Sequence, residues 1–114
     1  MPRPSSPSLG ELVRVLNAAT DKQVLHWGTT AEEDTFRTEL GIGIVNISKT
    51  SSPSRYLLSL LDQEGILLDE YQPSGEGELL AIEALYKKAR SQALNLEWKL
   101  KNLYDRIKSL AGET

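Results

Sequence analysis

The stretch ELLAIEALYKKARSQALNLEWKLKNLYDRIKSL, residues 78–110, keeps its apolar side chains in one uninterrupted helical register. Spacings of three and four residues alternate along it, which is the a/d heptad pattern of a helix that packs along an extended surface. The register is formed by Leu79, Ile82, Tyr86, Ala89, Ala93, Leu96, Leu100, Leu103, Ile107 and Leu110. Such a helix would be about 50 Å long. A domain of this size usually covers a shorter length of helix than this, so we expect the helix to contact a partner.

The apolar face of this helix narrows along its length. In the first half Leu80 and Leu85 broaden the face, which favours packing on a sheet. Beyond Ala89 only the a/d residues remain, so we expect the helix to extend partly beyond the sheet. The residues expected at an interface are Ala89, Ala93, Leu94, Leu96, Trp98, Leu100, Leu103 and Ile107. The heptad pattern fits a homodimer, with the two helices parallel or antiparallel, and it also fits docking to another protein. The alternative is that the heptads only pack the helix within its own monomer.

The segments before this helix predict an antiparallel sheet. Strands with alternating or β-branched apolar residues are expected over residues 35–40, 44–49, 56–61 and 66–71. Gly41 and Gly43 suit one tight hairpin, and Gly65 suits another, because glycine readily adopts positive φ. These four strands form a meander, and residues 24–29 are a further short strand candidate.

The N-terminal part predicts a tail followed by a helix. Residues 1–8 contain three prolines and are expected to be a disordered tail. Ser8 and Glu11 match a capping box that begins a helix over residues 9–20. The predicted fold is therefore α+β, of order α-β-β-β-β-α: a four-stranded antiparallel meander flanked by an N-terminal helix and a long C-terminal helix, in one domain over residues 9–114.

The periodicity of these segments also predicts the core. The expected sheet residues are Phe36, Leu40, Ile44, Ile47, Leu58, Leu60, Ile66 and Leu68, met by Leu12, Leu16, Leu79, Ile82 and Tyr86. A register shift near the two glycines would instead reverse the faces of strand 44–49. Ile42 is unusual at a hairpin tip, and it either packs on the first helix or contacts a partner.

Composition limits the class of protein. The 114 residues fit one domain, and no apolar run is long enough for a membrane span or matches a signal peptide. The chain has no cysteine, which excludes disulfides and thiolate sites and fits a cytoplasmic protein.

Charge is distributed unevenly along the chain. The formal charge is −3, but residues 1–86 carry a net −7 and residues 87–114 a net +4. A basic helix end could face an acidic body, in the same molecule or in a neighbour, or could face nucleic acid. The candidate nucleic-acid contacts are Lys87, Lys88, Arg90, Lys101 and Lys108. Nucleic-acid binding is the second hypothesis, because the chain is acidic overall and shows no basic-aromatic motif.

No catalytic constellation is apparent in the sequence. His26 is the only histidine, and the acidic run at residues 32–34 lacks the spacing of a calcium loop. No phosphate-binding glycine loop or nucleophile motif is present. We therefore predict no catalytic, cofactor-binding or metal-binding residue, and the leading hypothesis is a non-enzymatic protein–protein interaction module.

Overall fold

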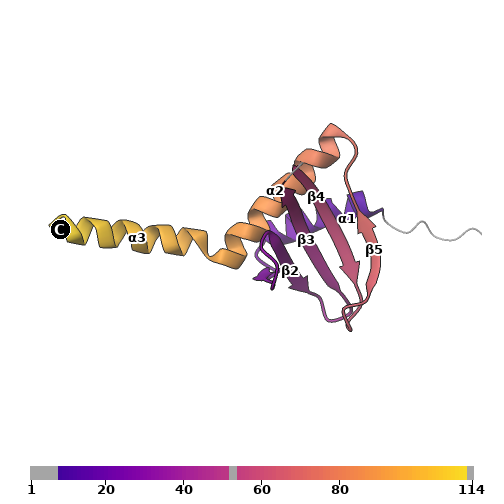
Figure 1. Ribbon diagram of the computed structural model, residues 1–114, viewed down its shortest axis with the longest axis horizontal. Coiled ribbons are helices and arrows are strands. Elements are labelled where there is room, and N and C mark those ends of the chain that lie inside the picture. Colours follow the sequence, from indigo (N-terminus) through magenta and orange to yellow (C-terminus); the bar gives the residue numbers. More distant parts are fainter. Residues whose placement is uncertain (1–7, 52–53, 113–114) are drawn as a thin grey trace, which may run out of the picture.

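The chain folds into an antiparallel sheet with helices on one side, as Figure 1 shows. The structure is a computed structural model, and it describes residues 8–51 and 54–112. In these residues the elements are α1 (Leu9–Asp21), β1 (Gly28–Thr29), β2 (Thr35–Glu39), β3 (Ile44–Ser51), β4 (Ser54–Leu61), β5 (Leu67–Tyr71), α2 (Glu76–Leu94) and α3 (Leu96–Leu110). The predicted α+β class with an antiparallel meander is confirmed.

The predicted number of strands was wrong. Over the described residues the sheet has five strands, in the order β1-β2-β3-β4-β5. The additional strand is β1, which pairs with β2, and it covers only two residues of the candidate at 24–29. It is short because Trp27 turns into the core, and the Trp27 backbone N–H donates to the side chain of Gln92 on α2 rather than to a strand.

The helix α1 begins at a side-chain cap. Ser8 Oγ accepts a hydrogen bond from the backbone N–H of Glu11 at 3.1 Å, which satisfies one of the free donors of the first turn. The rest of the predicted disordered tail, residues 1–7, lies outside the described residues.

The core lies between the sheet and the α1/α2 pair. In β2, β3 and β4 every second residue faces these helices; Ile47 pairs with Phe36 on β2 and with Leu58 on β4. The core consists of Val13, Leu16, Trp27, Phe36, Val45, Ile47, Tyr56, Leu58, Ile82, Leu85, Tyr86 and Ala89. The predicted members Leu12 and Leu60 are partly buried against it.

Several predicted core residues are not part of this cluster. Leu40, Ile66, Leu68 and Leu79 are each between 41 and 60 % exposed. The first three lie at the end and edge of the sheet, whereas α2 packs on β1 to β4. Ile44 and Ile47 cannot share a face because they are three residues apart, and Val45 takes the predicted place of Ile44 in the core.

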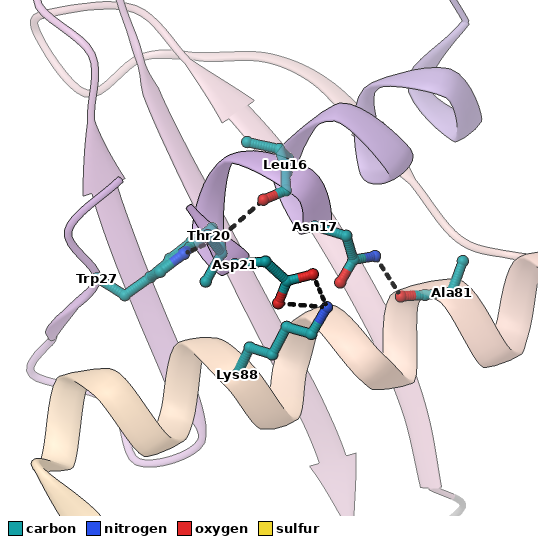
Figure 2. A network of polar contacts seen from close by, with 7 residues as sticks. All are labelled: Leu16, Asn17, Thr20, Asp21, Trp27, Ala81 and Lys88. Atoms are coloured by element: carbon teal, nitrogen blue, oxygen red, sulfur yellow. Dashed lines mark hydrogen bonds and ion pairs between the residues drawn. The ribbon is translucent and has the colours of Figure 1, made fainter. Parts of the chain in front are cut away.

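Polar contacts fix α1 against α2 and against the chain before β1 (Figure 2). The Trp27 indole Nε1–H donates to Thr20 Oγ1 at 3.0 Å, and the Thr20 hydroxyl donates to the carbonyl of Leu16 at 2.7 Å. Two further contacts join the helices directly: Asn17 Nδ2 donates to the carbonyl of Ala81, and Lys88 Nζ lies 2.9 Å from Asp21 Oδ1. These contacts join α1 to α2 and to Trp27, so α1 has a defined orientation against its neighbours.

The predicted continuous helix over residues 78–110 was wrong. Asn95 has φ 51° and ψ 46°, in the left-handed region, and it separates α2 from α3. Asparagine tolerates this conformation better than most residues, and its backbone N–H closes α2 by bonding the carbonyls of Gln92 and Ser91. The chain then turns, and α3 leads away from the sheet (Figure 1). The molecule is consequently elongated, with dimensions of 72 × 31 × 26 Å.

Tyr86 couples the core to the loop before β2. Its side chain is 5 % exposed, and its hydroxyl donates to Asp34 Oδ1 at 3.2 Å. Burial, followed by the negative charge of Asp34, raises the pKa of Tyr86 to about 12. The unfolded chain therefore loses this proton near pH 10, about two units before the folded chain does. This difference in the pKa of Tyr86 stabilises the folded chain fully below pH 10. The stabilisation, about 2–3 kcal/mol, is lost as the pH rises toward 12.

We expect this ionisation to be visible in urea unfolding measured between pH 8 and pH 12. Tyr86→Phe should reduce the fall in the free energy of unfolding above pH 10, because phenylalanine has no proton to lose. Tyr104→Phe, measured at a concentration where the chain is monomeric, is the matched control, since it removes the same hydroxyl from a side chain that is 61 % exposed in the single chain. An equal slope in wild type and Tyr86→Phe would contradict this assignment.

Candidate protein-interaction surface

The most prominent exposed feature of the molecule is an apolar stripe along α3. We use the name α3 stripe for Leu100, Leu103, Tyr104, Ile107 and Leu110, whose exposed fractions run from 56 to 73 %. These residues recur at intervals of three and four, so they share one face of the helix. Lys99 and Arg106 precede Leu100 and Ile107 and flank the stripe on one side. Within residues 8–51 and 54–112, the stripe is an apolar helical face that the rest of the fold leaves exposed.

The predicted interface residues before the α3 stripe are buried or partly buried, unlike the stripe itself. Ala89 is fully buried at 0 % exposure, so its predicted role in the interface was wrong: its methyl group packs in the core of the same chain. Ala93 and Leu94 are partly buried against that core, and Leu96 is half-buried at the start of α3. The part of the predicted heptad seam that is open to a partner therefore begins beyond Asn95.

Trp98 lies away from the α3 stripe. It is 67 % exposed, and its position on the helix is close to opposite Leu100 and Leu103. An open hollow of about 920 Å³ lies where α1, α2 and α3 meet, and Trp98 lines it together with His26 and Lys88. Lys88 is already paired with Asp21 there, so its charge is largely compensated. The hollow adds surface next to α3 but brings together no arrangement of groups that we can assign to a reaction.

The predicted basic flank is divided between two helices. Lys87, Lys88 and Arg90 lie on α2, whereas Lys101 and Lys108 lie on α3, beyond the turn at Asn95. The α2 lysines are engaged: Lys87 Nζ lies 3.0 Å from Glu83, and Lys88 pairs with Asp21. The hydrogen bond to Glu83 raises the pKa of Lys87. The structure thus does not form the single basic row that the heptad positions predicted.

Asp34, the last residue of the acidic run at residues 32–34, holds the loop before β2 in place. The Asp34 carboxylate accepts from Tyr86, and its carbonyl accepts from the backbone N–H of Lys49 at 3.0 Å. Asp34 has φ 59°, which turns the chain into β2. No group of histidine, cysteine and acidic side chains suited to a metal ion occurs within residues 8–51 and 54–112.

A second group of exposed apolar side chains lies at the end of the sheet where two hairpins turn. We use the name hairpin patch for Leu40, Ile42, Ile66, Leu67 and Leu68, whose exposed fractions run from 41 to 88 %. The β2–β3 and β4–β5 turns lie at the same end of the sheet (Figure 1), and the Gln63 side chain donates to the carbonyl of Gly41 across them. The periodicity of the sequence misplaced three of these residues in the core. The exposed position of Ile42 was the signal that pointed to a surface.

Comparison with known proteins supplies no relative for this arrangement. No family model, no curated protein and no solved structure matches the chain. Within the part of the chain that the structure describes, no helix has both the length and the apolar character that a bilayer span requires.

Proposed function

We propose that this chain is a non-enzymatic protein–protein interaction module that self-associates through the α3 stripe. The observation that carries the proposal is the exposure of five large apolar or aromatic side chains on one face of α3. A contiguous apolar face of this kind is unusual on a monomer and typical of a contact surface.

The stability of α3 supports the same proposal. The helix has 15 residues, and the main contact it makes with the other described elements is with α2, at the turn. An isolated helix of that length is marginal in water, because nucleation is unfavourable and helices in proteins depend on packing of an apolar face. A partner that covers the stripe would supply this packing.

Charge favours a second copy of the same chain as the partner. Residues 56–86 contain seven acidic and no basic residues, whereas residues 96–110, which form α3, contain four basic and two acidic residues. One molecule therefore carries both an acidic and a basic surface, and two copies can place them together without another protein.

The proposal is tested by sedimentation equilibrium of the full chain over a wide range of concentration. We expect the mean mass to rise from 12.7 kDa toward a multiple of that value as concentration increases. A mass that stays at 12.7 kDa up to millimolar concentration would contradict self-association. Retention of the chain on nucleic acid under the same conditions, weakening steeply with salt, would instead support the second hypothesis.

A further inference from the structure

The hairpin patch and the α3 stripe differ in the sign of the charged residues beside them. The apolar residues 66–68 of the hairpin patch are flanked in the sequence by the acidic residues Asp62, Glu64, Asp69 and Glu70, and no basic residue occurs between residues 56 and 86. The α3 stripe is apolar as well, but it is flanked by Lys99 and Arg106. The two surfaces therefore match in apolar character and have opposite charge.

Pairing of two α3 helices with each other is less favourable. The exposed stripe covers only about two heptads, so the apolar seam between two copies of α3 would be short. Two copies of α3 would also bring together two helices that each carry Lys99, Lys101, Arg106 and Lys108 against only Glu97 and Asp105. A complement with negative charge and its own apolar area is the better match for α3.

The stripe cannot meet the hairpin patch of its own molecule. α3 leaves the domain on the side of β2, and β5 forms the opposite edge of the sheet (Figure 1). The direction of α3, which Asn95 sets, carries the stripe away from the sheet. A contact between the two surfaces consequently has to form between molecules.

We propose that the hairpin patch of one copy is the docking site for the α3 stripe of a second copy. The inference rests on the proposed self-association and names the surface that receives α3. Leu100, Leu103 and Ile107 cover Ile42, Ile66 and Leu68, while Lys99 and Arg106 face the acidic border. The contact is between unlike surfaces, so it closes into a dimer only if both copies exchange helices, and otherwise it continues as a chain of molecules.

The direct test is a variant that damages the patch and leaves α3 intact. In Ile42→Lys/Leu68→Lys, two exposed apolar side chains become cations that repel Lys99 and Arg106. Ile42 is 88 % and Leu68 60 % exposed, so the fold should be retained, which circular dichroism and the urea midpoint would verify. We expect self-association measured by sedimentation to weaken by about tenfold or more.

Val15→Lys/Val24→Lys is the matched control for this variant. Val15 and Val24 are 62 % and 66 % exposed and lie outside the patch, so the control changes charge and exposed apolar area in the same way. It should associate as wild type does. If the patch variant also associates as wild type does, α3 docks elsewhere, and this inference is overturned while the proposed function stands.

A complementation experiment identifies the two surfaces together. Isotope-labelled Ile42→Lys/Leu68→Lys keeps its stripe, and unlabelled Leu100→Asp/Leu103→Asp keeps its patch. In the mixture we expect shifts of the amide resonances of residues 99–110, which detect dissociation constants up to about 1 mM. Absence of these shifts would overturn the inference, and a wild-type chain that is monomeric throughout would overturn the proposed function itself.

Discussion

Leu85→Ala is expected to lower the free energy of unfolding by about 2–5 kcal/mol. Leu85 is 0 % exposed and lies in the middle of α2, where that helix packs on the sheet. Alanine removes the buried apolar side-chain atoms beyond Cβ and leaves a cavity that the closely packed surroundings fill only in part. Since domains of this size are stable by only about 5–15 kcal/mol, the loss is a large share of the total.

The expected loss is measured by urea unfolding at a concentration where the chain is monomeric, because association would add to the apparent stability. Leu80→Ala is the matched control: it is the same substitution in the same helix, at a residue that is 67 % exposed. Its effect should stay within about 0.5 kcal/mol. Equal losses in the two variants would contradict the placement of α2 on the sheet.

The fold class followed from local patterns, whereas the outline of the core did not. Alternation within the strands and the hairpin glycines, Gly41 and Gly65, were enough to predict an antiparallel meander. The apolar residues 66–68 looked equally suited to the core, yet Ile66 and Leu68 are exposed. Which strands a helix covers depends on its direction across the sheet, and apolar periodicity carries no information about that direction.

The break in the long helix could not be predicted from the spacing of apolar residues. Asn95 lies off the heptad seam, so the spacing of apolar residues continues unchanged from Ala93 to Leu96. The only signal was the residue type, because asparagine is among the residues that most often take left-handed backbone angles. The same break explains why Ala89 was misassigned to the interface. The heptad seam is continuous in the sequence, but its residues pack in the core before Asn95 and are exposed to solvent after it.

Leu100→Asp/Leu103→Asp is expected to abolish self-association while preserving the fold. The two leucines are 65 % and 57 % exposed in the single chain, so aspartate at these positions costs the monomer little. In a contact the substitution removes about 1.5–3 kcal/mol of apolar burial per leucine and adds a charge that loses its water. The dissociation constant should therefore rise by at least about a hundredfold.

Asn102→Asp/Ser109→Asp is the matched control for that variant. It introduces the same two charges into α3, at exposed positions on the side away from the α3 stripe. The control is expected to keep a wild-type dissociation constant, because these side chains do not enter the proposed contact.

The central claim, that a second copy covers the α3 stripe, is tested most directly by sedimentation equilibrium of Leu100→Asp/Leu103→Asp beside wild type and this control. We expect wild type and the control to associate, and the stripe variant to remain at the mass of a single chain while it keeps a cooperative urea transition of the sheet domain. A stripe variant that associates as strongly as wild type would contradict the claim, and so would one that loses its fold, since the stripe would then belong to the core of the monomer.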